Sequence, residues 1–253
     1  MTQHITTRFK RVETKYLVPT KHLKPLLEDL KAYLTEDDFP NSTISNIYFD
    51  TPDFEVIKDA LAGRNKREKI RMRCYAQKPT SASQAFLEIK QKDLEGVGHK
   101  LRLVSTPPLI NQLLVHGRSD KSITDHHLVQ EIYDLRDRYE GLSPRIFIYY
   151  ERYSLKQKKG AEDKVRVTFD KNLRYRDNHV DLTSGNSGKA LLDTDHIIME
   201  IKASKDKPNW LQEILDKHGL IQIKFSKYAC AYHRSEGLDY QPRPAILNEK
   251  VGV

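Results

Sequence analysis

The sequence has few cysteines and no long apolar run. Its 253 residues include two cysteines, Cys74 and Cys230, and no Cys-x-x-Cys or Cys/His ligand spacing. This scarcity fits a reducing cytoplasm and argues against a zinc site. No apolar run approaches the roughly 20 residues of a membrane-spanning helix, and the first residues, MTQHITTRFKR, lack the apolar core of a secretory signal. We therefore expect a cytoplasmic protein without a membrane segment in this chain.

Repeats, low-complexity tracts and long Gly/Ser-rich linkers are also absent from the sequence. We therefore expect one domain over residues 1–239, followed by an irregular tail over residues 240–253. The chain is 38% hydrophobic and 31% charged, which suits a globular protein with a sizeable core. Its formal charge of +8 favours an anionic partner, without separating nucleic acid from phosphates.

Local sequence patterns predict a strand-rich α+β chain with inserted helices. Strands are predicted at residues 8–18, 43–50, 69–76, 84–92, 99–104, 144–156, 164–170, 173–177 and 194–203. Helices are predicted at residues 20–33, 53–61, 106–116, 124–139, 208–217 and 226–235. About eight main strands with antiparallel connections suit a closed barrel, although a sandwich or an open sheet fits the same pattern.

The stretch KIRMRCYAQ, residues 69–77, places apolar and basic side chains on opposite faces of its predicted strand. Ile70 and Met72 share one face, whereas Arg71 and Arg73 share the other. Five further predicted strands repeat this alternation. Their polar faces carry Arg11, Glu13 and Lys15; Glu88, Lys90 and Lys92; Lys100 and Arg102; Lys164, Arg166, Thr168 and Asp170; and Glu200 and Lys202.

Two interpretations fit this alternation. The charged faces either meet water, as in an ordinary half-buried sheet, or line the interior of a closed sheet covered by helices. The second is favoured because the helices need apolar strand faces to pack on. A Glu-x-Lys spacing also recurs at Glu13, Glu88 and Glu200. A cationic interior repels itself unless an anion fills it, and Arg and Lys suit phosphate oxygens. A carboxylate among them could hold Mg²⁺ or Mn²⁺.

Eight stretches along the chain together resemble a known superfamily. They are RVETKYLV, IYFDTPDF, KIRMRCY, FLEIKQK, YYERYSLK, KVRVTFDKNLRY, IIMEIKASKDKPNWL and KFSKYACAYH. In this order, over residues 8–234, they resemble the triphosphate tunnel metalloenzymes, and among these the polyphosphate-polymerase branch with a vacuolar transporter chaperone (VTC) domain. The resemblance implies an eight-stranded antiparallel closed β-barrel, the triphosphate tunnel, with helices packed on the outside. It also implies transfer of the γ-phosphate of ATP to a phosphate or polyphosphate chain end, with Mn²⁺ or Mg²⁺.

The same resemblance assigns roles to individual residues. Catalytic positions would be Lys15, Arg71, Arg73, Lys90, Arg166 and Lys227. Further phosphate-binding positions would be Lys100, Arg152, Lys202 and Lys224. Glu200, in the stretch MEIK, would hold the metal ion. The expected partners are a nucleoside triphosphate and polyphosphate, triphosphate or orthophosphate.

One assigned residue breaks the alternation rule. Arg152 has the same parity as Ile146 and Ile148 rather than that of the charged set. A β-bulge near Tyr150 would move Arg152 to the charged face.

One residue departs from the motif of a related branch of the superfamily. Arg11 stands where the adenylate-cyclase and thiamine-triphosphatase branch has the first Glu of its E-x-E-x-K motif, which favours the polymerase-like branch.

An inorganic or nucleoside triphosphatase remains an alternative function, since water would then replace the phosphate acceptor. A non-catalytic module that binds polyphosphate or nucleic acid is a second alternative. No single-strand-binding motif is recognisable, so we expect no nucleic acid partner; a membrane-bound protein partner is compatible with the sequence.

Overall fold

The computed structural model describes residues 12–64, 67–92, 98–160, 164–204 and 206–245. Long strands form most of it: β1 Val12–Pro19, β2 Leu34–Asp50, β3 Arg67–Cys74, β4 Ala85–Lys92, β5 Gly98–Ser105, β6 Ser143–Gln157, β7 Val165–Arg176 and β9 His196–Ala203. The short strands are β8 Lys189–Ala190, β10 Gln222–Lys224 and β11 Arg243–Pro244. The helices are η1 Thr20–His22, α1 Leu23–Leu30, α2 Glu55–Leu61, α3 Pro107–Leu114, α4 His126–Arg138, α5 Asn209–Lys217 and α6 Lys227–Ser235.

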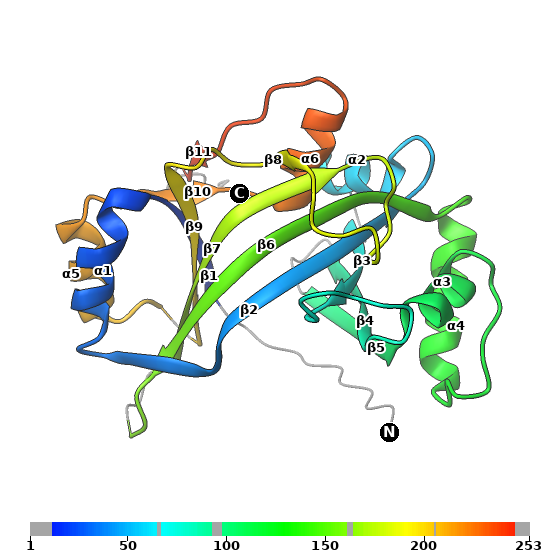
Figure 1. The fold of residues 1–253 in the computed structure, drawn as a ribbon, viewed down its shortest axis with the longest axis horizontal. Coiled ribbons are helices and arrows are strands. Elements are labelled where there is room, and N and C mark those ends of the chain that lie inside the picture. Colours follow the sequence, from blue (N-terminus) through cyan, green and yellow to red (C-terminus); the bar gives the residue numbers. More distant parts are fainter. Residues whose placement is uncertain (1–11, 65–66, 93–97, 161–163, 205, 246–253) are drawn as a thin grey trace, which may run out of the picture.

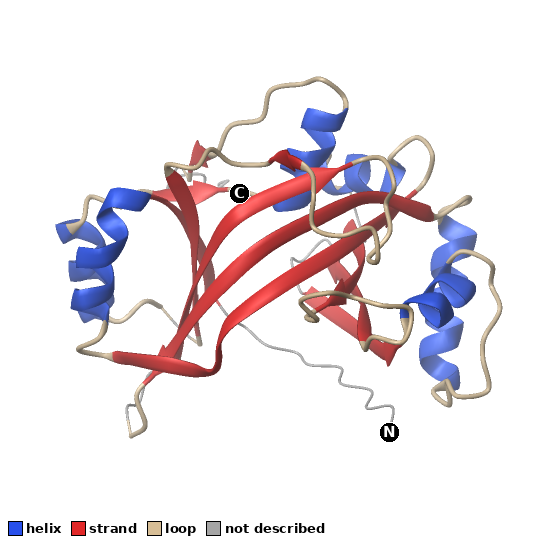
Figure 2. Cartoon of the chain, viewed as in Figure 1, coloured by secondary structure: helices blue, strands red, loops and turns tan. Residues whose placement is uncertain are grey.

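The strands form one curved antiparallel sheet in the order β11-β10-β1-β9-β7-β6-β2-β3-β4-β5, with β8 paired to β7 (Figures 1 and 2). The expected α+β class and antiparallel strands are therefore confirmed. The expected closed barrel is not, because in the described ranges no hydrogen-bonded ladder joins β5 to the β1 side of the sheet.

Side chains connect the two sides of the sheet where strand pairing does not. The Lys69 ammonium of β3 donates to the Ser226 hydroxyl at 3.3 Å. The Lys15 ammonium of β1 donates to the Phe225 carbonyl at 3.1 Å. The segment before α6 thus contacts both β3 and β1.

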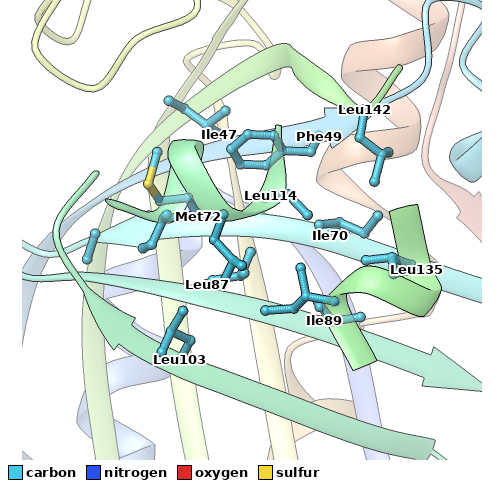
Figure 3. Close-up of a cluster of buried hydrophobic side chains, with 14 of the residues drawn as sticks. Ile47, Phe49, Ile70, Met72, Leu87, Ile89, Leu103, Leu114, Leu135 and Leu142 are labelled. Atoms are coloured by element: carbon cyan, nitrogen blue, oxygen red, sulfur yellow. The ribbon is translucent and has the colours of Figure 1, made fainter. Parts of the chain in front are cut away.

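The convex face of the sheet is covered by two pairs of helices. Helices α3 and α4 pack on the apolar face of β2, β3, β4 and β5, where Ile70, Met72, Leu87 and Leu114 are buried together (Figure 3). Helices α1 and α5 cover the corresponding face of β1, β7 and β9. The expected outer apolar face is therefore present, and Cys74 is buried on it, as its parity predicted.

Helix α6 contradicts the expectation that all helices lie outside. Tyr228 of α6 stacks on Tyr48 of β2, with ring centroids 4.3 Å apart. Tyr48 is the cross-strand partner of Arg71, so both residues lie on the same, concave face. Five consecutive residues of α6, from 228 to 232, are buried, and a helix buried on all sides belongs in an interior. Helix α6 therefore fills one end of the concave face, beside α2 (Figure 1).

The position of α6 explains the parity of Arg152. The β2–β6 register pairs Ile146 with Tyr48 and Arg152 with Ser42 without a shift between them, so Ile146 and Arg152 share the concave face. Ile146 is buried there in the core that contains α6. The irregularity expected near Tyr150 exists in the β6–β7 ladder, but the extra residue lies in β7, where Asn172 has a φ of 53°. Arg152 thus reaches the charged face without a bulge in its own strand.

Several boundaries differ from those predicted. The two strands expected at 164–170 and 173–177 are one strand, β7, and β2 begins at Leu34 rather than at residue 43. In the expected irregular tail, Arg243 and Pro244 pair with β10. Arg11 and the start of the first predicted strand lie outside the described residues. The single-domain boundary at residue 239 stays a prediction.

Candidate functional site

The concave face carries charged side chains at matching positions on neighbouring strands, and we call it the inner wall. Cross-strand partners on it are Arg71 with Glu88 and Glu88 with Arg102. On the other side of the sheet the partners are Arg152 with Asp170 and Arg166 with Lys202. A two-residue repeat in each strand therefore produces one charged surface from strands that are far apart in sequence.

A cavity of about 1520 Å³ lies against the inner wall. The predicted site residues that border it are Arg71, Arg73, Lys90, Lys100, Arg152, Arg166 and Lys202. The cavity extends beyond the wall, since residues of the other strand face, such as Tyr149 and Phe169, also border it. The structure thus brings together basic residues from β3, β4, β5, β6, β7 and β9.

The remaining predicted site residues lie elsewhere. Three of them belong to the inner wall but do not border the cavity: Lys15, Lys227 and Glu200. Lys224 is exposed on β10, where its cross-strand partner is Arg243. The structure therefore does not bring Lys224 into the site.

Glu88 is the buried counter-ion of one side of the wall. Its side chain is 2% exposed, and its carboxylate lies 2.7 Å from an Arg71 nitrogen and 2.6 Å from Lys100 Nζ. Arg102 Nε lies 3.6 Å away. Burial alone would raise the pKa of Glu88, but Arg71, Arg73 and Lys100 hold it far below its usual value. Glu88 is therefore ionised and fixes the positions of the cations around it.

Asp170 has the same role on the other side. It is completely buried and accepts hydrogen bonds from Arg152 at 2.6 and 2.8 Å and from Lys227 at 2.6 Å. Burial would raise its pKa, but Lys227 and Arg152 lower it. Both cations also lie over the Tyr150 ring, at 5.3 and 4.6 Å from its centroid. This network positions Arg152 with one side toward the cavity.

Arg73 differs from these cations because its described partners are neutral. It donates to the Asn46 side-chain oxygen at 2.8 Å, the Tyr150 hydroxyl at 3.1 Å and the Tyr75 hydroxyl at 3.4 Å. The residue is 8% exposed. Its guanidinium is thus held rigidly while no carboxylate in the described part of the chain pairs with it, which leaves its charge available to an anion.

Lys90 is another cation of the wall without a direct carboxylate partner among the described residues. It borders the cavity, where burial together with the neighbouring charges of Arg71 and Lys202 lowers its pKa to about 7. Burial also lowers the pKa of Lys69, assisted by Lys15 and Arg71. Several cations therefore lie close together at the centre of the wall, and protonation of Lys90 or Lys69 costs free energy there.

The Glu200 carboxylate forms an ion pair with a lysine of the inner wall. The carboxylate lies 2.7 Å from Lys202 Nζ, and Glu13 lies 3.8 Å from the same nitrogen. Across the described ranges, no three His, Cys, Asp or Glu side chains gather as a set that could hold a metal ion. These residues do not fit an ion held by protein ligands alone. They fit a Mg²⁺ or Mn²⁺ ion that takes one or two carboxylates and relies on phosphate oxygens and water for the rest.

Other residues of the site were not assigned by the resemblance. Glu88, Arg102 and Asp170 all belong to the polar faces that the alternation identified, so the pattern contained them. Lys69 lies on the same polar face of KIRMRCYAQ as Arg71, so the alternation identified it as well. Asp50 has a structural role: its carboxylate accepts hydrogen bonds from the amides of Val56 and Ile57 at the start of α2, at 2.9 and 3.0 Å.

Comparison with known proteins identifies the family. The sequence profile of the VTC domain matches residues 10–235, which is most of the chain. The chain belongs to the VTC domain family. The resemblance drawn from the eight motifs is therefore confirmed, and the VTC domain of this protein includes the whole inner wall.

A solved structure agrees with this VTC domain in fold. A Bacillus halodurans protein described as a "putative adenylate cyclase" is 14% identical, with a TM-score of 0.52 over 87% of this chain and 95% of that one. A Vibrio parahaemolyticus protein described in the same words is also 14% identical, with a TM-score of 0.44 over 88% and 98%. Comparison with curated proteins gives no match. None of the helices in the described ranges has the length and apolar character to cross a membrane.

Proposed function

We propose that this VTC domain is an ATP-dependent polyphosphate polymerase that requires Mn²⁺ or Mg²⁺. The observation that carries the proposal is the set of basic side chains from six strands facing one cavity of about 1520 Å³. Pockets for small ligands usually measure about 300–1,000 Å³. A cavity above that range, with cations along its wall, has room for a triphosphate donor and a phosphate acceptor together.

In this proposal the arginines bind the donor. Arg71, Arg73, Arg152 and Arg166 come from three different strands and border the same cavity, so their planar guanidinium groups suit a triphosphate clamp. Arg73 contributes most directly, because its hydrogen bonds in the described residues go to neutral groups and none goes to a carboxylate. Lys90, Lys100 and Lys202 would hold the acceptor phosphate, and Lys15 and Lys227 would support the wall behind them.

These residues would align the donor and acceptor phosphates and stabilise their negative charge. In phosphoryl transfer, an acceptor oxygen forms a bond to the γ-phosphorus while the bond to the leaving ADP oxygen breaks. A phosphate acceptor is already anionic near neutral pH and needs no strong base. The wall offsets the repulsion between the two anions and fixes them in line.

A divalent ion would bind beside Glu200 and Glu13, which share Lys202 as a partner. Such an ion would supply positive charge that offsets the negative charge of the phosphates. Glu200 would orient that ion from the protein side, and Lys202 would turn to the phosphates.

Product analysis tests the proposal. Purified protein is incubated with ATP and Mn²⁺, and the products are separated by chain length. Chains longer than a few phosphates, lost in Arg71→Ala, support polymerase activity. Free phosphate with ADP or pyrophosphate as the only products would make the domain a triphosphatase, and tight polyphosphate binding with no turnover would make it a binding module.

A further inference from the structure

The inner wall changes character at one end of β3, β4 and β5. Along β3 the wall runs from Lys69 through Arg71 to Arg73, and Tyr75 directly follows the end of the strand. Across the strands, Arg73 is opposite Phe86, and Phe86 is opposite Val104. The charged surface thus ends in two aromatic rings and a valine, at the end of the wall opposite to the one that α6 fills.

These apolar side chains are accessible, which a purely structural role does not require. Tyr75 is 41% exposed and Val104 36% exposed, and Phe86 is half-buried. Tyr75 and Phe86 both border the large cavity. Exposed apolar groups with a charged rim are typical of a binding surface.

The two rings are held in a fixed arrangement by arginines. Tyr75 and Phe86 contact edge to face, with centroids 5.6 Å apart and an interplanar angle of 73°. The Arg102 guanidinium lies 4.2 Å from the Phe86 centroid, and that of Arg73 lies 5.8 Å from the Tyr75 centroid. Aromatic rings and guanidinium planes are the surfaces on which nucleobases stack.

We propose that Tyr75, Phe86 and Arg102 form a nucleobase subsite that binds the base of the nucleoside triphosphate donor. This inference rests on the proposed use of a nucleotide by the inner wall. The base stacks at the aromatic end, and the ribose and triphosphate extend along β3 past Arg73 to Arg71 and Lys90. The γ-phosphate then lies deepest, where the cations crowd.

The spacing along β3 fits this orientation. Arg71 lies in β3 and Tyr75 directly follows its last residue, four positions later, which is about 14 Å for an extended chain. An extended nucleotide covers a comparable length from base to terminal phosphate. Gln77, Ser83 and Gln84 also border the cavity and offer amide and hydroxyl groups for the polar edge of a base.

The subsite predicts discrimination between a nucleotide and an inorganic phosphate chain. Inorganic tripolyphosphate would use the same cations without touching Tyr75 or Phe86. The dissociation constants of ATP and of tripolyphosphate are therefore measured by calorimetry for the wild type, Tyr75→Ala, Phe86→Ala and the double variant. We expect ATP binding to weaken about tenfold or more in the double variant, with tripolyphosphate binding unchanged within about twofold.

A matched control is available in the same cavity. Phe39 also borders it and is 81% exposed, but no arginine of the described residues lies over its ring. Phe39→Ala should leave both dissociation constants unchanged. Tyr75→Phe and Phe86→Tyr keep a stacking surface, so these variants should bind ATP about as tightly as the wild type.

The results separate this inference from the proposed function. Equal weakening of ATP and tripolyphosphate, or no weakening of either, overturns the subsite. Wild-type protein that binds tripolyphosphate but not ATP overturns it as well, while leaving the phosphate site intact. A selective loss of ATP affinity in protein that makes no polyphosphate chains supports the subsite and rejects the polymerase.

Discussion

The Glu88 carboxylate lies 2.7 Å from the Arg71 guanidinium, in the middle of a wall where most other charges are positive. Only 2% of the Glu88 side chain is exposed, so the pair is shielded from bulk water. When no phosphate is bound, the buried Glu88 carboxylate offsets the repulsion among the cations around it. A bound phosphate chain would add to that negative charge and would compete with Glu88 for the same guanidinium.

Replacing this carboxylate therefore changes stability in a ligand-dependent way. In Glu88→Gln, Arg71 and Lys100 lose their buried counter-ion, and we expect a loss of about 3 kcal/mol in the free energy of unfolding. Tripolyphosphate can supply the missing negative charge, so it should raise the melting temperature of the variant more than that of the wild type. Thermal unfolding with and without tripolyphosphate measures both shifts.

Glu151→Gln is the control, because Glu151 pairs with Lys171 at 3.5 Å and is partly exposed. Its melting temperature should change little, and its response to tripolyphosphate should match that of the wild type. Equal ligand-induced shifts in Glu88→Gln and the wild type would show that Glu88 does not compensate the charge of the phosphate site.

Binding of a phosphate chain should also take up a proton at Lys90. The pKa of Lys90 is lowered to about 7 in the free protein by burial and by Arg71 and Lys202. A bound polyanion favours the charged ammonium and raises this pKa, so above about pH 7 the complex holds more protons than the free protein. Affinity for tripolyphosphate should therefore fall as the pH rises above about 7.

Calorimetry at pH 8 in two buffers of different protonation enthalpy measures this uptake. We expect up to about one proton from Lys90 in the wild type and a smaller number in Lys90→Arg, whose guanidinium stays charged. Protons exchanged by the ligand itself are the same in both proteins and cancel in the difference. Identical proton uptake by the two proteins would contradict the assignment to Lys90.

Arg73→Lys tests whether the guanidinium shape matters as well as its charge. Lysine keeps the positive charge but cannot donate at once to Asn46, Tyr150 and a phosphate. We expect turnover to fall about 100-fold, as when one preorganised donor is removed from a reacting anion. Steady-state rates with ATP and Mn²⁺ measure the effect, and a variant that retains wild-type turnover would remove Arg73 from the donor clamp.

Lys202 and Lys224 give a matched pair of lysine substitutions. Lys202 borders the cavity, whereas Lys224 is exposed on β10 and lies outside it. Lys202→Ala should weaken tripolyphosphate binding about tenfold, in the range of a charge-assisted contact, and Lys224→Ala should leave it unchanged. Titrations at one ionic strength compare them, and equal losses would indicate a diffuse charge effect rather than a defined site.

The charged face of each strand could be predicted because alternation is a local property with a period of two residues. Arg71, Glu88 and Arg102 are on one face for this reason, whatever the rest of the chain does. The pairing of Glu88 with three cations could not be predicted, since it depends on the register of β3, β4 and β5. Sequence alone also could not show that no ladder joins β5 to the β1 side within the described residues.

The misreading of Arg152 has a different cause. The alternation rule assumed that the inner wall is charged along its full length, so Ile146 and Ile148 were assigned to the outside. Helix α6 buries that end of the wall and needs apolar partners there, which is a tertiary effect. The available signal in the sequence was the run YACAY at residues 228–232, because a helix whose middle has no charged side chain is not expected on the surface.

The most direct test of the account is the position of a bound phosphate chain. A crystal structure of the protein with tripolyphosphate and Mn²⁺ would place that chain relative to the inner wall. We predict phosphate oxygens within hydrogen-bond distance of Arg71, Arg73 and Lys90, inside the cavity. A chain bound only on the convex face or at Lys224, with the inner wall untouched, would contradict the account.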